Sequence, residues 1–261
     1  MKVSALVCAH NEAAQLGECV ASLRGFDQIV VVADRCTDAT VEIARRAGAV
    51  VVEGAFDLES HRKEAGFAAC AGEWVLEIDA DERVSPELTA EIRAAVATAQ
   101  GDWFKVPIDN YVGATLVRHG WGGSFGSTLG ARLARRGFKH WKLERVHPGV
   151  KFDGVSAGVL TCAIQHYVDE DLSDMVQRLN RYSLLRGLDL ADRGEPGELW
   201  DNVFRGFRRF WKCYFDRKGR VDGDLGFAIS LMAGLYPLLS HLKAKEILQQ
   251  RAAAGARAAA E

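Results

Sequence analysis

The first hundred residues alternate short apolar runs with stretches of helical periodicity. Four runs rich in Val, Ile and Leu are typical of buried parallel strands, and they cover 2–9, 28–34, 49–54 and 73–79. Between these runs, apolar positions at helical spacing predict helices at 13–23, from a cap at Thr37 or Asp38 to Gly48, and at 58–71. Strands that alternate with helices of this length indicate right-handed β-α-β units. We therefore expect an α/β fold whose mostly parallel sheet is flanked by helices.

The pattern changes after residue 100. The segment 103–113 has the character of a strand, the glycine-rich segment 119–137 has the composition of a loop, and 159–167 is predicted to be the last strand. Helical spacing then predicts three helices, at 171–193, 197–218 and 224–252. We expect an α/β domain at 1–168, with halves at 1–100 and 101–168, followed by a C-terminal helical appendage at 169–261.

Polar side chains gather where the predicted strands end. Ligands of an open α/β sheet bind outside the carboxyl ends of its strands. The carboxylates that the sequence places at this edge are Glu12, Asp34, Asp38, Asp79 and Asp81. A carboxylate that opens a helix can simply complement the helix dipole, and this remains the alternative for Glu12.

Asp79 and Asp81 are the most informative pair at this edge. Residues i and i+2 of a strand share a face, so both carboxylates can point to one spot, where a cation would relieve their repulsion. Hard oxygen ligands suit Mg²⁺ or Mn²⁺. The alternative is a loop that only caps the next helix, but Ser85 before Pro86 already supplies that cap. Two carboxylates are left over, which favours a metal site.

Composition and absent motifs exclude several classes. The net charge of −2 gives no global basic field, so we expect no nucleic-acid partner. The six cysteines form no Cys-x-x-Cys pair, which fits neither a zinc site nor a disulfide framework and indicates reduced thiols in the cytosol. Neither a Gly-x-Gly-x-x-Gly nor a P-loop follows the first strand, which argues against dinucleotide and P-loop nucleotide binding.

Three blocks of the sequence resemble, in order and spacing, the family 2 inverting glycosyltransferases of GT-A (Rossmann-like) fold. They are Asn11-Glu12 after the first strand, "DRCTDAT" after the second, and "GEWVLEIDADE", which contains the DXD motif. Further matches resemble the subgroup that adds sugars to the inner core of lipopolysaccharide, and they lie at Gly120-Trp121, Arg132-Leu133, Val146-His147 and His166-Tyr167. The resemblance covers nearly the whole chain. It implies transfer of a sugar, expected to be a hexose, from a nucleoside-diphosphate donor to a glycolipid such as lipopolysaccharide core, with UDP favoured and with Mg²⁺ or Mn²⁺ as cofactor.

The same resemblance implies roles for individual residues. Asp81 would ligate the metal, and His166 would complete the metal shell or touch the diphosphate. A lone histidine is structural about as often as it is functional, so a structural role is the alternative for His166. The residues that it assigns to donor binding are Asn11, Glu12, Asp34, Lys63, Asp79 and Arg132. On this basis 1–100 is the nucleotide-sugar half of the catalytic domain and 101–168 is the acceptor half.

The catalytic base is the least determined role. Direct displacement at the anomeric carbon needs a base on the acceptor hydroxyl. The subgroup often has Glu after its Val-His, but this chain has Pro148 there. We therefore rank His147 first, Glu144 second and Asp109 third, all in the acceptor half. The alternative for His147 is packing within a loop.

Two basic regions remain. The segment 132–151 holds seven Lys and Arg residues, which indicate either a solvated face or a site for a phosphate-rich acceptor. The segment 200–215 places aromatic side chains on one arc of a helix and cations on the flank beside it, which is typical of an interfacial helix but also fits ordinary packing. The uncharged stretch 225–242 reaches the lower length limit for a spanning helix, but Gly226, Gly234 and Pro237 interrupt it. We expect a protein peripheral to the inner face of the cytoplasmic membrane.

Two other functions stay open from the sequence. A sugar nucleotidyltransferase would use the same frame, but "AHNEAAQLGE" lacks the glycine-rich first loop with Arg and Lys that such an enzyme needs. A non-catalytic nucleotide-sugar-binding protein is the other alternative, because the Glu after Val-His is missing. Sugar, nucleotide, acceptor and oligomeric state are not fixed by these residues.

Overall fold

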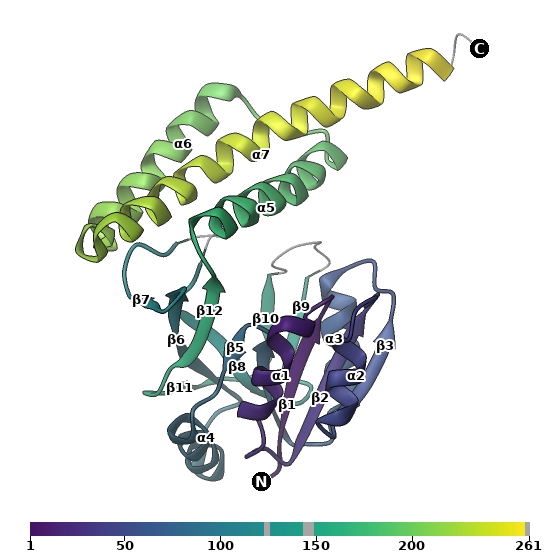
Figure 1. Ribbon diagram of the computed structural model, residues 1–261, viewed down its shortest axis with the longest axis vertical. Helices are drawn as coiled ribbons and strands as arrows, with labels where there is room; N and C mark the ends of the chain where they lie inside the picture. Colours follow the sequence, from purple (N-terminus) through teal and green to yellow (C-terminus); the bar gives the residue numbers. More distant parts are fainter. Residues whose placement is uncertain (123–125, 143–148, 259–261) are drawn as a thin grey trace. The chain divides into compact units, whose positions relative to one another are not determined.

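The computed structural model describes residues 1–122, 126–142 and 149–258 (Figure 1). The chain forms two compact units. The first comprises Met1–Tyr111 and Thr128–Val168, and the second comprises Val112–Ser127 and Asp169–Glu261. The segment 112–127 was expected in the acceptor half of the first domain, but it belongs to the second unit.

Four parallel strands form one half of the sheet in the first unit. They are β1 (Val3–Ala9), β2 (Gln28–Asp34), β3 (Val50–Gly54) and β4 (Trp74–Asp79), in the spatial order β3-β2-β1-β4. In this register Ala9 lies beside Ala33, and Cys8 lies beside Asp79. The predicted strands and the parallel sheet are confirmed, and the carboxyl ends of β1, β2 and β4 meet at one edge.

Helices cover both faces of these strands. Leu16 and Val20 of α1 (Ala13–Ser22) pack with the odd-numbered side chains of β1, together with Ala44 of α2 (Thr40–Arg46). Phe67 of α3 (Glu59–Ala69) packs on the opposite face with Leu6. The alternation of side chains along each strand therefore divides the core into two layers.

Helix starts in this unit follow local capping chemistry. α4 (Pro86–Thr98) begins as predicted, with Pro86 in its first turn and the Ser85 hydroxyl accepting the Leu88 N–H at 3.1 Å. The cap predicted at Thr37 or Asp38 was wrong, because α2 begins at Thr40. The Asp38 carboxylate accepts the N–H groups of Thr40 and Ala13, both at 3.0 Å, and so joins the turn before α2 to the start of α1.

The second half of the sheet is antiparallel. β8 (Leu129–Arg135) lies between β4 and β6 (Trp103–Val112) and is antiparallel to both. β6 is followed in space by β12 (Ile164–Asp169) and then by β5 (Glu82–Arg83), which is antiparallel to β12. The interpretation of 119–137 as loop was wrong for 129–135. Pairing on both edges makes a strand of a segment whose own residues favour a loop.

Short strands complete the first unit. β9 (Lys139–Trp141) and β10 (Val150–Phe152) form an antiparallel pair, and β11 (Ser156–Val159) runs parallel to β6.

A buried ion cluster lies inside this unit. Glu77 of β4 is 3% exposed, and its two carboxylate oxygens accept from the ammonium groups of Lys63 and Lys139. Lys139 also donates to the Ala131 carbonyl at 2.9 Å, and Lys63 lies 3.3 Å from Glu59. Burial raises the pKa of Glu77, but the charges of Lys139 and Lys63 outweigh it and lower the pKa to about 2. Glu77 is therefore held as an anion between two cations.

The second unit is helical, as predicted. Its elements are β7 (Thr115–Val117), α5 (Leu172–Asp192), α6 (Leu199–Trp211), the π-helical η2 (Lys212–Asp216), the 3₁₀ helix η3 (Gly219–Asp222) and α7 (Gly223–Ala258). α7 packs against both α5 and α6 (Figure 1). It is long and apolar enough to cross a membrane, and 44% of its most apolar window is buried within the protein.

The segment before residue 123 is tied to these helices. The His119 N–H donates to the Asp222 carboxylate at 2.6 Å, and the Arg217 guanidinium donates to the Trp121 carbonyl at 2.8 Å. The Gly120 N–H donates to the Arg217 carbonyl at 3.0 Å. Trp121 itself is buried. Residues 112–122 are therefore an integral part of the second unit.

Two glycines allow α6 and α7 to pack closely. A Cβ at Gly206 would lie 2.6 Å from the Gly234 carbonyl oxygen, which is backbone and cannot rotate away. We expect Gly206→Val to lower the free energy of unfolding by about 1–3 kcal/mol through overpacking, measured by urea denaturation followed by circular dichroism. Gly255→Val is the control, because a Cβ there meets nothing within 4 Å. Equal stability of the two variants would contradict the close packing.

Candidate active site

The candidate site lies at the edge where β1, β2 and β4 end. Asn11 follows β1 in a left-handed conformation, with φ of 56°, and its side-chain oxygen accepts the Thr37 N–H at 2.8 Å. The next residue, Glu12, donates its N–H to the Thr40 hydroxyl at 2.8 Å. Asn11 thus joins the loops that follow β1 and β2. Its contact with a donor stays a prediction, as does that of Glu12.

Asp34 at the end of β2 is buried and held on both carboxylate oxygens. One oxygen accepts the Phe56 N–H at 3.1 Å, and the Arg35 guanidinium lies 3.0 Å from each oxygen. Arg62 of α3 is 3.9 Å away. Such a bidentate pair fixes the carboxylate in one orientation. The structure therefore gives Asp34 a defined position at the predicted nucleotide edge.

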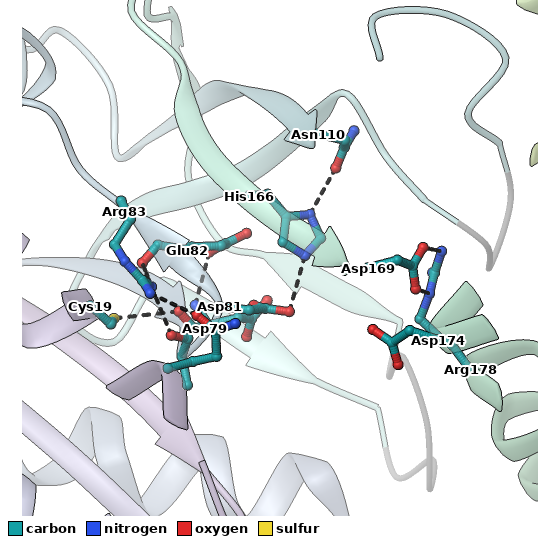
Figure 2. Close-up of polar contacts among 12 residues, drawn as sticks. Cys19, Asp79, Asp81, Glu82, Arg83, Asn110, His166, Asp169, Asp174 and Arg178 are labelled. Carbon is teal, nitrogen blue, oxygen red and sulfur yellow. Dashed lines mark hydrogen bonds and ion pairs between the residues drawn. The ribbon is translucent and has the colours of Figure 1, made fainter. Parts of the chain in front are cut away.

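The turn from β4 to β5 separates the two aspartates of the DXD motif. β4 ends at Asp79, and Ala80 and Asp81 form the turn before Glu82. The expectation that both carboxylates share one strand face was therefore wrong, since the i, i+2 relation holds only within a strand. Asp79 lies 2.8 Å from Arg132, whereas Asp81 faces His166 (Figure 2).

Arg132 of β8 joins Asp79 to a buried neighbour. Its guanidinium is 2.8 Å from Asp79 and 2.7 Å from Glu82, and the second Glu82 oxygen accepts the Asp79 N–H at 2.8 Å. Removal from water raises the pKa of Asp79, but Arg132 and then Lys63 outweigh this and lower it. Burial raises the pKa of Glu82 to about 7 against the opposing charge of Arg132. Arg132, assigned to the donor from sequence, is the residue that holds Asp79.

Asp81, His166 and Asn110 form the second cluster of the site. His166 Nδ1 lies 2.7 Å from the Asn110 side-chain oxygen, and its Nε2 lies 3.3 Å from Asp81 Oδ2 (Figure 2). Because a carbonyl oxygen only accepts, Nδ1 is the donor and Nε2 is directed at the carboxylate. Burial lowers the pKa of His166, but the hydrogen bond and charge of Asp81 raise it to a greater extent. Asn110 thereby orients the imidazole ring.

These residues fit a divalent cation. Asp81 Oδ1 is buried and has no hydrogen-bond partner among the described residues, which is unfavourable unless a ligand compensates it. A histidine that binds a metal usually donates its other ring N–H to an oxygen acceptor, and the Asn110 oxygen supplies such an acceptor for His166. The described part of the chain contains no group of three His, Cys, Asp or Glu that could hold a metal. Mg²⁺ needs only one or two carboxylates, because waters and substrate phosphates supply its other ligands.

Other predicted residues have different outcomes. Lys63 is paired with Glu77 inside the core, so its role at a phosphate stays a prediction. His147 and Glu144, the predicted bases, lie outside the described residues, and Asp109 lies on β6.

The basic segment 132–151 is largely paired within the first unit. Arg132 binds Asp79 and Glu82, and Lys139 binds Glu77. Three further side chains have partners of their own: Arg135 binds Glu73, Arg136 donates to the Cys70 carbonyl, and Lys151 lies 3.4 Å from Asp153. These five cationic side chains are therefore already engaged within the first unit and are not a set of unpaired groups for acceptor phosphates.

Neither Asn110 nor the role of Glu82 was predicted from the sequence. Val106, Ile108, Asn110 and Val112 all point to the buried side of β6. A polar residue in an otherwise apolar row of a strand must have a buried partner. That alternation was a usable signal for Asn110.

Comparison with known proteins places this site in context. The family model "Glycosyl transferase family 2" matches residues 4–142. A Rickettsia felis protein named "Uncharacterized glycosyltransferase" is 28% identical over 95% of this chain and 90% of its own. "Lipopolysaccharide core biosynthesis glycosyltransferase LpsC" of Rhizobium meliloti is 26% identical over 93% and 92%. The crystal structure of S. aureus TarS 1-349 in complex with UDP-GlcNAc is similar in fold, with a TM-score of 0.50 and 14% identity over 95% of this chain and 89% of that one.

Proposed function

Because the chain belongs to glycosyl transferase family 2, we propose that it transfers a sugar, a hexose, from a nucleoside diphosphate to a glycolipid acceptor with inversion at the anomeric carbon. UDP is the proposed nucleotide and Mg²⁺ or Mn²⁺ the proposed cofactor. The observation that carries the proposal is the Asp81 carboxylate beside His166 at the ligand-binding edge of the sheet, with one buried oxygen lacking a hydrogen-bond partner among the described residues. A lipopolysaccharide core is the proposed acceptor, supported by the name of the Rhizobium meliloti relative.

The residues at this edge divide the work. Asp34, fixed by Arg35, would accept hydrogen bonds from the base or ribose, and Asp79, which ends β4 and is fixed by Arg132, would lie near the ribose or the metal. Asp81 and His166 would hold the metal, which supplies positive charge near the leaving diphosphate. Asn110 keeps the imidazole oriented. The buried Glu82 limits the movement of Arg132 and hence of Asp79.

Acceptor activation is proposed for the segment that contains His147 and Glu144. A base there would take the proton of the attacking hydroxyl on the side opposite the leaving group. Direct attack produces one inversion and no covalent enzyme intermediate. Residues 1–100 are the proposed nucleotide-sugar half, and the proposed acceptor half, 101–168, is reduced by the 112–127 segment that belongs to the second unit.

A peripheral location at the inner face of the cytoplasmic membrane is proposed as well, with 169–261 as the docking region. A glycolipid acceptor keeps its lipid in the bilayer, so an enzyme acting on its headgroup gains from residing at that surface.

Metal-linked donor binding separates the proposal from its rivals. We expect UDP to bind more tightly with Mn²⁺ than without it and more tightly than ADP, GDP or CMP, measured by isothermal calorimetry and by ligand-dependent thermal stabilisation. Slow hydrolysis of the matching UDP-sugar would distinguish a transferase from a non-catalytic binding protein. Formation of a sugar nucleotide from a nucleoside triphosphate and a sugar phosphate would support a nucleotidyltransferase. UDP binding that is indifferent to metal would contradict the proposed role of Asp81.

A further inference from the structure

Four large aromatic side chains of α6 lie on the surface of the second unit. Trp200, Phe204, Phe207 and Trp211 are 76%, 63%, 60% and 50% exposed. Their spacing of four, three and four residues places them on one stripe of the helix. We call these four residues the aromatic face. Exposed aromatic side chains in a contiguous stripe mark a binding surface, because water solvates them poorly.

Packing fixes the direction of the aromatic face. Asn202 and Gly206 of α6 are buried, and Gly206 meets Gly234 of α7. These positions lie on the side of the helix opposite the aromatic stripe. α6 therefore cannot turn the aromatic face inward without losing its close contact with α7.

The apolar surface continues onto α7. Trp211 contacts Phe215, with ring centroids 4.2 Å apart, and Phe210 contacts Phe227 of α7 at 5.8 Å. Phe227 and Leu231 are themselves 46% and 40% exposed. The exposed apolar surface thus includes side chains from both α6 and α7.

Cations follow one flank of the aromatic face. They are Arg205, Arg208 and Lys212, with the acidic Asp201 among them, whereas Arg209 is half-buried and lies over the Tyr236 ring of α7. Arg208 lies over the Phe204 ring, with its guanidinium carbon 6.0 Å from the centroid. Across residues 1–122, 126–142 and 149–258, no ion pair joins any of these three flank cations to a carboxylate. The flank therefore presents a net positive charge directly beside apolar rings.

We propose that the aromatic face lies in the interfacial layer of an anionic lipid bilayer, with its cationic flank against the lipid phosphates. This inference rests on the proposed peripheral location and specifies the surface that produces it. Tryptophan and phenylalanine beside Lys and Arg are the composition of helices that lie in the membrane plane. A second copy of the chain fits less well, because an antiparallel two-fold dimer through this face would bring the cationic flanks together. α7 stays packed between α5 and α6 and does not span the bilayer.

Vesicle cosedimentation of the full chain tests this proposal. We expect binding to phosphatidylglycerol-containing vesicles, weak binding to pure phosphatidylcholine vesicles, and release by salt. Phe204→Ser with Phe207→Ser should weaken binding by about 10-fold or more. Arg208→Glu with Lys212→Glu should weaken binding to anionic vesicles by about 10-fold or more, with little change on neutral ones.

A matched control and two further measurements make the result decisive. Val176→Ser with Leu184→Ser removes exposed apolar side chains from α5 and should leave vesicle binding unchanged. All variants should keep the wild-type thermal transition. Wild-type binding in the Phe204/Phe207 variant would overturn the inference, as would sedimentation showing a dimer that this variant dissociates. Transfer to a delipidated, soluble acceptor should be the same in every variant, and its absence from all of them would refute the proposed function while leaving the vesicle result intact.

Discussion

Replacing Asp81 by Asn is expected to lower turnover by about 10³-fold, because the neutral amide keeps the shape of the side chain but would not hold the proposed cation beside the diphosphate. The carboxylate faces His166 on one oxygen, and its other oxygen is buried. The variant should also lose the Mn²⁺-dependent part of UDP binding. Steady-state kinetics at saturating donor and calorimetry with and without metal measure the two effects.

Two further variants sharpen this expectation. Asp57→Asn changes an exposed carboxylate beyond the end of β3 and should leave turnover near wild type. Asn110→Ala removes the partner of His166 Nδ1 and should raise the Mn²⁺ concentration needed for half-maximal activity by about 10–100-fold, with turnover recovering at high metal. Full activity of Asp81→Asn, or loss of activity in Asn110→Ala that metal does not relieve, would contradict the assigned metal site.

Replacing Glu77 by Gln is expected to lower the free energy of unfolding by about 3–5 kcal/mol. The reason is that Lys139 would remain buried without a compensating anion, and Lys63 would keep only Glu59. Urea denaturation at neutral pH measures the loss. Glu73→Gln is the control, since it breaks a more exposed pair with Arg135 and should cost under about 1 kcal/mol.

The same cluster predicts a pH dependence. The pKa of Glu77 falls from an ordinary 4.5 to about 2 in the folded protein. Its contribution is therefore fully present above pH 4.5 and is lost as the pH falls through 2, which amounts to about 3 kcal/mol. Wild-type stability should decline over this range, and Glu77→Gln should lack that part of the decline. A triple replacement with Met at both lysines and Leu at Glu77 should recover much of the stability, because it leaves no buried charge. An acid limb unchanged in Glu77→Gln would contradict the cluster.

Local signals account for what the sequence predicted about the fold. β1 to β4 are apolar runs bounded by polar residues, and Ser85 with Pro86 defines the start of α4 by chemistry that needs no distant partner. β8 was missed because its stability comes from β4 and β6 on its two edges, not from its own glycine-containing residues. The start of α2 was misplaced because Asp38 also accepts the N–H of Ala13, the first residue of α1.

The same division applies to the site. The family resemblance implied that Asp81 and His166 lie at one site, and the structure brings them to 3.3 Å. The partner of Asp79 did not follow, because Arg132 reaches it from a strand that the sequence pattern did not predict. The family resemblance predicted that Lys63 neutralises a phosphate, whereas in the structure Lys63 is buried and paired with Glu77. Charged residues in the core have partners set by tertiary contacts, which periodicity alone does not reveal.

The tie between residues 112–122 and the helices has a practical consequence for protein engineering. Hydrogen bonds join His119 to Asp222, and Gly120 and Trp121 to Arg217. A segment from the middle of the chain therefore completes the helical unit. A chimera that exchanges the C-terminal region at a single crossover near residue 169 would join a foreign helix layer to a native loop. Trp121 would then lose contacts with the native helical unit, including the hydrogen bond from Arg217. Exchange of this unit between related enzymes therefore requires that 112–127 be replaced together with 169–261.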